Sequence, residues 1–405
     1  MATQQVLVVR IAFGAIKYAL IDASDRTEHG HGKAHGISTA AGEVLHTVAG
    51  HTFEVENELP DYETALNLIL KMIHSHCGEV EISAVAHRVM HGADLFTQPT
   101  LIDDEVIVAI ERLAALAPSH NLAAAEGIRA AMKLLPDLPH VAIFDTAFFH
   151  DLPPEVSTYA LPEEITKKLH IRKYGFHGTT HAYVSERVSL LLGHDEIRQI
   201  VCYLGKGSSI SAVAAGRPIE VSTGLSSIEG LPMRSRSGML DPGIHNYVVS
   251  QTGMSLAEFT RILTENSGLY GMTGHTDMRK IWAAADAGDE RSNLAIDLIT
   301  HRIVSYIAAY HGVLGGAQAI SFTGSIGEND YRLRKKVCDR LECIGVEIDT
   351  ETNARTNSET TSRIISVTAS EIPILMVHQR DAVAMARQTA ELLGWGSKNQ
   401  TPPTP

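Results

Sequence analysis

The chain has 405 residues, and its 47 Asp and Glu against 34 Lys and Arg give a formal net charge of -13. This length favours two globular domains. A composition of 44% hydrophobic and 20% charged residues excludes wholesale disorder. The acidic balance argues against a nucleic-acid-binding protein, because DNA and RNA phosphates are bound by clustered Lys and Arg. Any anionic ligand should therefore be held by a local basic pocket.

Neither a targeting segment nor a membrane span is predicted. The N-terminus lacks a basic region followed by a long apolar core and a cleavage site, so we expect a cytoplasmic protein. Residues 303–327 carry no Asp, Glu, Lys or Arg, but several glycines interrupt them. A buried helix, a turn and a buried strand fit this stretch better than a membrane span. The four widely spaced cysteines indicate neither a zinc site nor a disulfide framework.

The predicted elements alternate between strands and helices along the chain. Residues 6–9 and 15–21 predict a hairpin around a glycine-containing turn, and residues 200–204 and 210–214 predict a second one. Two similar hairpins half a chain apart suggest an internal duplication. We also expect helices at 62–76, 104–115, 290–310, 331–341 and 381–393, and strands at 84–89, 140–144 and 319–322. This alternation predicts α/β layering with a mainly buried sheet.

The domain boundary is predicted in a stretch rich in prolines and acidic residues. Residues 152–172 form this stretch and fit a crossover between the halves. We therefore expect one domain at 1–150, joined by the C-terminal helix at about 381–393, and a second domain at 151–380. The Gly-, Ser-, Asn- and Pro-rich residues 394–405 predict a flexible tail.

Three glycine-bearing turns follow apolar runs and indicate a nucleotide site. They lie at residues 204–208 (LGKGS), 271–274 (GMTG) and 322–329 (FTGSIGEN). Glycines after a strand let backbone N–H groups approach phosphate oxygens without a side chain in the way. None of the three matches a P-loop, and each alone also fits a simple chain reversal.

A polar constellation accompanies these turns. It comprises residues 87–92 (HRVMHG), 144–146 (FDT), 174–181 (YGFHGTTH) and 234–238 (RSRSG). Arginine forks grip a carboxylate or a phosphoryl group in two places, and a carboxylate orients an acceptor or a metal. The alternative interpretation makes Arg88 and Asp145 a scaffold ion pair, His177 and His181 core histidines, and the paired arginines a solvated surface.

Several longer segments resemble acetate kinases. These include HRVMHGADLFTQPTLI, VAIFDTAFFHDLPPEVSTYALPEEI, IRKYGFHGTTHAYVSER, IEGLPMRSRSGMLDPGI and FTGSIGEN, which occur in that family's order between residues 86 and 329. The resemblance implies an α/β fold of two duplicated actin-like (ribonuclease H-like) domains, with the nucleotide in an interdomain cleft. It also implies reversible phosphoryl transfer from ATP, the co-substrate, to a short-chain carboxylate such as acetate, and a homodimer.

Site roles carry over from the family to matching positions. The resemblance implies catalytic roles for Asp145, His177 and Arg236. It implies that the carboxylate substrate contacts Arg88, Met90, His120 and Phe176. The implied ATP and phosphate contacts are Lys17, Tyr203, Gly205, Lys206, Gly207, Asp277, Arg279, Gly324, Ser325, Gly327 and Asn329.

The chain departs from the family pattern where Mg²⁺ is expected. The family's N-x-G-S-S-S-x-K hairpin is RIAFGAIK at residues 10–17, and its P-T-x-E-E motif is HQRDA at 378–382, which leaves Asp381 as the candidate metal ligand. Oxygen ligands suited to Mg²⁺ are lost, while Arg10, Lys206 and Arg234 add cleft cations. We hypothesise that the cleft binds a polyanion with reduced dependence on metal.

Two alternatives stay open. Instead of an acetate-kinase-like enzyme, the chain could be a catalytically impaired paralogue that binds an anion or nucleotide in a regulatory role. The other alternative is a kinase of the same fold with another acceptor or another donor such as pyrophosphate. The bulky Phe13 in the first hairpin favours the former. The acyl pocket departs from the family pattern as well, because Met90 replaces a smaller aliphatic residue and Ser119 and Ser227 replace leucine and proline. A more polar pocket would favour a hydroxylated or otherwise different carboxylate over acetate, and drift without a change of substrate is the alternative.

Overall fold

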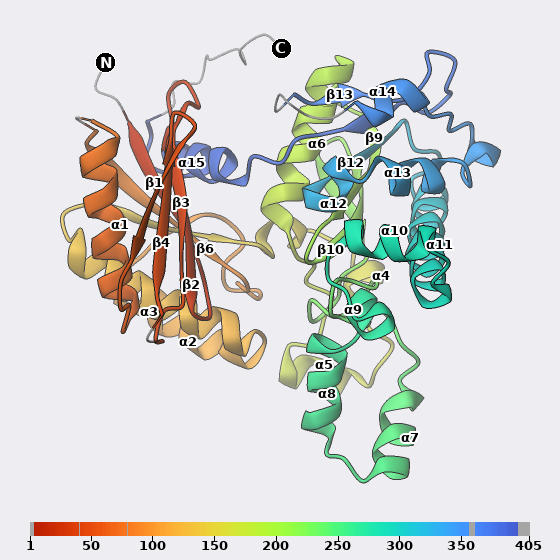
Figure 1. Ribbon diagram of the computed structural model, residues 1–405. Coiled ribbons are helices and arrows are strands. Elements are labelled where there is room, and N and C mark those ends of the chain that lie inside the picture. The colour runs from red at the N-terminus through yellow and green to blue at the C-terminus, as the bar shows by residue number, and fades with distance from the viewer. Residues whose placement is uncertain (1–3, 40, 79, 356–360, 396–405) are drawn as a thin grey trace. The chain divides into compact units, whose positions relative to one another are not determined.

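The computed structural model describes residues 4–39, 41–78, 80–355 and 361–395. The chain divides into two compact units (Figure 1). The first contains Met1–Phe148 with Arg380–Pro405, and the second contains Phe149–Gln379. Of the tail predicted at 394–405, residues 396–405 lie outside the described part. Trp395 packs against the hydrophobic core of the first unit.

The first unit is built on an eight-stranded sheet in the order β5-β4-β3-β2-β1-β6-β8-β7. Its strands are β1 (Gln5–Ala12), β2 (Ala15–Asp22), β3 (Glu28–His35), β4 (Glu43–Val48), β5 (His51–Glu56), β6 (Ile82–Val89), β7 (Thr100–Leu101) and β8 (His140–Phe144). Strands β1 to β5 form an antiparallel meander, whereas β6 is parallel to both β1 and β8. No strand is predicted from the sequence between residues 28 and 56. In this stretch β3 buries only Gly30 and Ala34 and lacks an apolar alternation.

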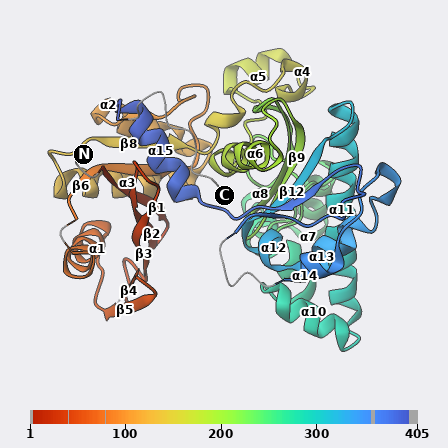
Figure 2. The same cartoon turned by 90° about the horizontal axis from the view of Figure 1, so that it is seen from above.

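Helices cover both faces of this sheet (Figure 2). Strand β1 alternates, so that Leu7 and Val9 pack with α1 (Tyr62–His76) and α3 (Pro118–Leu134), whereas Val6 and Val8 pack with α15 (Asp381–Leu392). The helix predicted at 104–115 is α2 (Asp104–Arg112), followed by a 3₁₀ turn, η1 (Leu113–Ala115).

The second unit repeats the strand order of the first. Its six-stranded sheet runs β11-β10-β9-β12-β14-β13, with β9 (Arg198–Leu204), β10 (Ser208–Ala214), β11 (Arg217–Val221), β12 (Ala319–Thr323), β13 (Arg363–Ile364) and β14 (Ile374–Met376). Here the antiparallel meander has three strands instead of five, and it is again followed by two parallel strands. The duplication predicted from the two hairpins is therefore present in the topology.

Helices also cover both faces of the second sheet. Helix α6 (Gly178–Leu192) packs on β9 and β12, and the opposite face carries α10 (Met278–Asp286), α11 (Glu290–Val313) and α13 (Tyr331–Cys338). The remaining helices are α4 (Pro154–Ser157), α5 (Glu163–Leu169), α7 (Gly243–Thr252), α8 (Leu256–Glu265), α9 (Gly268–Thr273), α12 (Gly324–Asn329) and α14 (Thr350–Ala354), with the 3₁₀ turns η2 (Ala147–Phe149) and η3 (Glu342–Ile344).

Two stretches with glycines have different outcomes. The turn predicted at 271–274 is wrong, because residues 268–273 form α9 and Gly274 ends that helix at a φ of 77°. Residues 303–327 contain the end of α11, a turn at Gly315 and Gly316, and the buried strand β12, as predicted. Among the described helices, none is long and apolar enough to cross a membrane.

Candidate active site

In the first unit, Arg88 and Asp145 meet at the ends of two parallel strands. Strand β6 lies beside β8 with Arg88 opposite Ile143, so the carboxyl ends of both strands lie at one edge. The Nε of Arg88 donates to Oδ1 of Asp145 at 2.9 Å, and its Nη2 pairs with Oδ2. Asp145 is 1% exposed, whereas the Arg88 side chain is 28% exposed. The ion pair between Arg88 and Asp145 that the alternative interpretation expects is therefore present, and the arginine is still accessible to solvent.

The loop after β6 is fixed by hydrogen bonds from neighbouring elements. The backbone N–H of His91 donates to Oδ1 of Asn121 at 3.2 Å, and Nδ2 of Asn121 donates back to the His91 carbonyl at 3.0 Å. Met90 and His120 are half-buried and directly precede His91 and Asn121, one after β6 and one in α3. Three of the four residues predicted for the carboxylate substrate, Arg88, Met90 and His120, thus come from the end of β6 and from the helix that Asn121 ties to it.

In the second unit, His177 and Arg236 converge on the hairpin turn between β9 and β10. A Cβ atom added to Gly207 would lie 3.0 Å from Nε2 of His177 and 3.6 Å from Nη1 of Arg236. The ring of His177 also lies 4.5 Å from that of Tyr203, centroid to centroid. Glycine at this position therefore keeps open the space that both side chains border.

A buried hydroxyl holds His177 in place. Oγ of Ser209 lies 2.9 Å from Nδ1 of His177 and 2.7 Å from Nε2 of His181. The other ring nitrogen of His181 lies 2.7 Å from Oγ of Ser211. Burial lowers the pKa of His181 well below 6.5, with a further contribution from His177. Ser209 was not predicted from the sequence. Only the pairing of β9 with β10 in the folded hairpin brings it next to the two histidines.

Arg236 is a partly buried cation without a carboxylate partner among the described residues. Its Nη1 donates to the carbonyl of Ser227 at 3.2 Å. Burial, and next the neighbouring Arg234, lower the pKa of Arg236. Two guanidinium groups held this close favour an anion between or beside them.

A pocket of about 940 Å³ opens beside the same hairpin. This volume is within the range of pockets that bind small molecules and cofactors. Seven of the residues predicted from the sequence line it, namely Gly205, Lys206, Arg234, Asp277, Arg279, Ser325 and Asn329. Gly324 and Gly327, predicted for the last phosphate loop, are buried behind this lining, and the N–H of Gly324 donates to Glu328.

Residues that sequence reasoning missed form one wall of this pocket. The guanidinium of Arg332 stacks on the indole of Trp282 at 4.0 Å and pairs with both carboxylate oxygens of Asp286 at 2.7 Å. Nε1 of Trp282 donates to Asp330 at 2.8 Å. These contacts hold a flat aromatic and guanidinium surface at the pocket wall. Trp282 is one of only two tryptophans, which is the signal that could have indicated it.

Asp277 and Arg279 form an exposed pair at the start of α10. Arg279 donates to both carboxylate oxygens of Asp277, its Nη2 at 2.6 Å. These hydrogen bonds lower the pKa of Asp277 to about 2. The carboxylate is therefore ionised at neutral pH and caps the helix by accepting from the Arg279 backbone N–H.

The remaining predicted residues lie elsewhere. Phe176 is 1% exposed and sits in the core of the second unit, with its N–H bonded to Thr223. Lys17 and Arg10 lie opposite each other on β2 and β1 of the first unit. Asp381, the candidate metal ligand, accepts from Nη1 of Arg10 at 3.2 Å. The predicted metal ligand is therefore engaged by a guanidinium.

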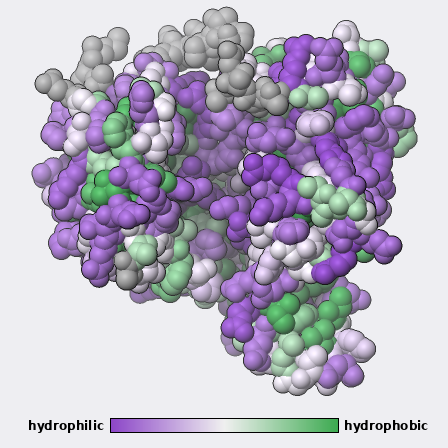
Figure 3. Space-filling view, viewed as in Figure 1, coloured by the Kyte–Doolittle hydropathy of each residue, from purple (hydrophilic) through white to green (hydrophobic). Residues whose placement is uncertain are grey.

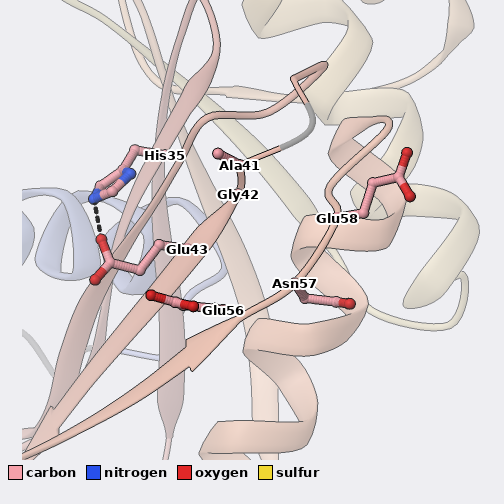
Figure 4. A pocket seen from close by; sticks show the side chains of 7 residues that line it. All are labelled: His35, Ala41, Gly42, Glu43, Glu56, Asn57 and Glu58. Carbon is pink, nitrogen blue, oxygen red and sulfur yellow. Dashed lines mark ion pairs between the residues drawn. The ribbon is translucent and has the colours of Figure 1, made fainter.

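A second pocket, of about 570 Å³, lies along the meander of the first unit (Figure 4). Its lining carries three glutamates, and His35 pairs with one of them, Glu43. No residue predicted for the site lines it. Its acidic lining is unsuited to an anionic ligand.

Comparison with known proteins identifies the family. The sequence model described as the Acetokinase family matches residues 5–387. The chain belongs to this family. It is 40% identical over 398 residues to an acetate kinase of Thermotoga maritima, a match that covers 96% of this chain and 98% of the relative. An acetate kinase of Streptomyces coelicolor is 39% identical, with 97% and 98% covered.

Solved structures of the Acetokinase family share its fold. The acetate kinase of Porphyromonas gingivalis superimposes with a TM-score of 0.91 at 34% identity, over 96% of this chain and 100% of the other. A propionate kinase of Francisella tularensis superimposes with a TM-score of 0.90 at 36% identity, over 95% and 98%. The duplicated, actin-like α/β fold expected from the resemblance is confirmed.

Proposed function

We propose that the protein is a carboxylate kinase that reversibly transfers the γ-phosphoryl group of ATP to a short-chain carboxylate, with acetate giving acetyl phosphate. The observation that carries this proposal is the convergence of His177 and Arg236 on Gly207 in a chain of the Acetokinase family. A phosphoryl group in transfer spreads negative charge over its equatorial oxygens. A guanidinium and an imidazole bordering one open space are suited to stabilise that charge.

The acceptor chemistry needs cations more than a base. A carboxylate is already ionised at neutral pH, so its oxygen attacks phosphorus without giving up a proton, and ADP leaves. The main obstacle is repulsion between two anions, which Arg88 offsets by gripping the acceptor carboxylate. Asp145 fixes the plane of Arg88 through two hydrogen bonds. We therefore assign Asp145 to orient Arg88, with Met90 and His120 flanking the acceptor.

The nucleotide is proposed to bind in the 940 Å³ pocket of the second unit. The face of Trp282 and its stacked Arg332 suit a purine ring. Lys206 and Arg234 supply positive charge at the hairpin, and Gly205 allows close approach of phosphate oxygens. Asp277 and Arg279 lie on the remaining rim.

The assembly and location are also proposals. We propose a homodimer because the family resemblance implies one. Figure 3 shows hydrophobic residues gathered on the lobe that carries α7 and α8. Helix α7 buries no residue, and Tyr247 and Leu256 are 67% and 59% exposed. We propose the cytoplasm as the location, where ATP is supplied.

The activity is tested by trapping acyl phosphate as hydroxamate. Purified protein is incubated with ATP, Mg²⁺ and, in turn, acetate, propionate or a hydroxylated short-chain acid. We expect hydroxamate with at least one acid and none without ATP. A protein that binds ATP yet forms no hydroxamate with any acid would instead support the impaired paralogue. Hydroxamate formed with pyrophosphate but not with ATP would show that pyrophosphate is the phosphoryl donor.

A further inference from the structure

Three positive side chains form one row across neighbouring strands of the first unit. The strand register places Arg10 of β1 opposite Lys17 of β2 on one side and opposite Arg88 of β6 on the other. Directly opposed residues project to the same face of a sheet. Val6 and Val8 alternate with the same phase as Arg10 and pack against α15. The cationic row (Lys17, Arg10 and Arg88) therefore continues the face that α15 covers.

Two carboxylates border this row, and both are engaged. Asp381, the first residue of α15, is 8% exposed and accepts from Nη1 of Arg10. Asp145 is 1% exposed and accepts from Arg88. The Arg10 and Arg88 side chains stay 31% and 28% exposed, so a solute can reach them.

The Mg²⁺ that the family resemblance implies does not fit these residues. Mg²⁺ in kinases is held by one or two carboxylates together with substrate phosphates. Here both candidate carboxylates already accept guanidinium N–H groups. Within the described ranges, no group of three or more His, Cys, Asp and Glu could hold a metal ion. A divalent cation at this place would also face three fixed positive charges.

The row is instead suited to an anion. Like charges placed directly opposite each other destabilise a sheet unless a counter-charge is present. Arg10 uses Nη1 for Asp381, and its Nε and Nη2 find no acceptor among the described residues. The ring of Phe13, which the sequence suggested as an obstruction, is 87% exposed at the hairpin tip and so does not cover the row.

We propose that the cationic row binds a phosphate group directly, with Arg10 supplying the charge neutralisation that the resemblance assigns to Mg²⁺. Asp381 holds Arg10 in place and is not a metal ligand. Phosphate is the chemistry that matches, since a guanidinium fork pairs two of its oxygens and an ammonium neutralises a third. The inference deepens the proposed function but does not need turnover, because the row lies within one unit.

The test is calorimetric titration of the full chain with inorganic phosphate, first in EDTA and then with Mg²⁺. We expect binding in EDTA, and little change when Mg²⁺ is added. Arg10→Asn should weaken binding by about tenfold or more, because a charged hydrogen bond is lost. The matched control is Arg129→Asn, which removes an exposed arginine paired with Glu111 and should bind as the wild type does. Binding that strictly requires Mg²⁺, or an unchanged affinity in Arg10→Asn, would overturn the inference.

Two further variants keep the test decisive if Arg10→Asn folds poorly. Arg10→Lys retains the charge and should bind phosphate more tightly than Arg10→Asn. Asp381→Asn removes a competing anion and should tighten phosphate binding in EDTA. Loss of Mg²⁺-dependent binding in Asp381→Asn would instead identify a metal ligand. Phosphate binding in EDTA without any hydroxamate formation would support this inference and contradict the proposed function. Hydroxamate formation without phosphate binding in EDTA would support the proposed function and contradict this inference.

Discussion

At the scale of single residues, a hydroxyl decides how a histidine is presented. Ser209 bonds both His177 and His181, and His181 is anchored in turn by Ser211. This chain of contacts fixes the His177 ring, whose Nε2 faces the position above Gly207. Ser209 is therefore a positioning residue, whereas His177 and Arg236 are the proposed catalytic residues.

Replacing Ser209 should separate turnover from binding. Ser209→Ala should lower kcat by up to about 100-fold, because a displaced His177 ring is no longer oriented toward the phosphoryl group. KM for the carboxylate should change little. Ser209→Thr keeps the hydroxyl and should recover part of the rate. Steady-state hydroxamate assays check this, and equal losses in both variants would point to a packing effect only.

Replacing Arg236 should remove charge stabilisation in the transition state. We expect Arg236→Ala to lower kcat by about 100-fold or more, as for other donors aimed at developing negative charge. The control Arg261→Ala removes an exposed arginine of α8 and should leave the rate unchanged. An Arg236→Ala enzyme with wild-type kcat would refute this placement of the site.

At the scale of elements, strands β6 and β8 are tied by a buried histidine pair. Nε2 of His140 lies 3.0 Å from the carbonyl of Leu135, which accepts only, so this nitrogen carries the proton. Its Nδ1 then accepts from Nε2 of His87 at 2.9 Å. Both rings are neutral in this arrangement, and burial lowers the pKa of both histidines. His87 directly precedes Arg88 on β6, and His140 is the first residue of β8, the strand that leads to Asp145.

This pair should make stability fall with acid. Because the folded pKa of His87 lies well below 6.5, the unfolded chain binds the proton first, and stability present above about pH 6.5 is lost as pH falls below it. The thermal midpoint of the wild type should drop between about pH 7.5 and about pH 5.5, by more than that of His87→Leu. His74→Leu, at an exposed position of α1, should follow the wild type. Equal slopes in all three proteins would contradict the assignment.

Helices α10 and α13 together make the flat wall of the nucleotide pocket. Trp282→Ala should weaken ATP binding by about tenfold or more, because stacking on a base is worth about 1–3 kcal/mol. Trp282→Phe keeps a ring and should retain most of the affinity. Calorimetric titration with ATP and with adenosine measures both effects. An Ala variant that binds adenosine as tightly as the wild type would exclude a base at this wall.

At the scale of the whole molecule, one strand order is used twice. In each unit the first strand pairs with an antiparallel strand of its meander on one side and with the first of two parallel strands on the other. The site residues follow from this repeat, since each unit places side chains in its first hairpin and at its parallel strand ends. The cationic row uses β1, β2 and β6, and the glycine turn at Gly207 joins β9 and β10.

The proposed homodimer is tested by light scattering. Wild-type protein should have twice the chain mass in solution. We propose the apolar surface of α7 and α8 as the contact between subunits. The double variant Tyr247→Asp with Leu256→Asp should have the monomer mass, because a dimer would bury two carboxylates in this apolar contact. Leu101→Asp, at a position 54% exposed in the first unit, should remain a dimer. A monomeric wild type would contradict the proposal.

Local signals were strong enough to predict a good part of the fold. Helix α1 has the predicted bounds because Asp61 caps it and its apolar residues recur with the helical period. Helix α13 ends three residues earlier than predicted, at Cys338. Strand β3 escaped prediction because it buries only a glycine and an alanine and has no apolar pattern of its own. Strand β5 escaped because nearly all of its residues are exposed.

The sequence by itself determined the family, the duplicated α/β plan and the list of candidate residues, because these depend on local motifs and their order. Only the tertiary structure decided which of those residues act together. Strand register sets Arg10 between Lys17 and Arg88, and helix α15, at the far end of the chain, brings Asp381 to Arg10 across 371 positions. Such contacts join residues distant in sequence, so no local pattern encodes them.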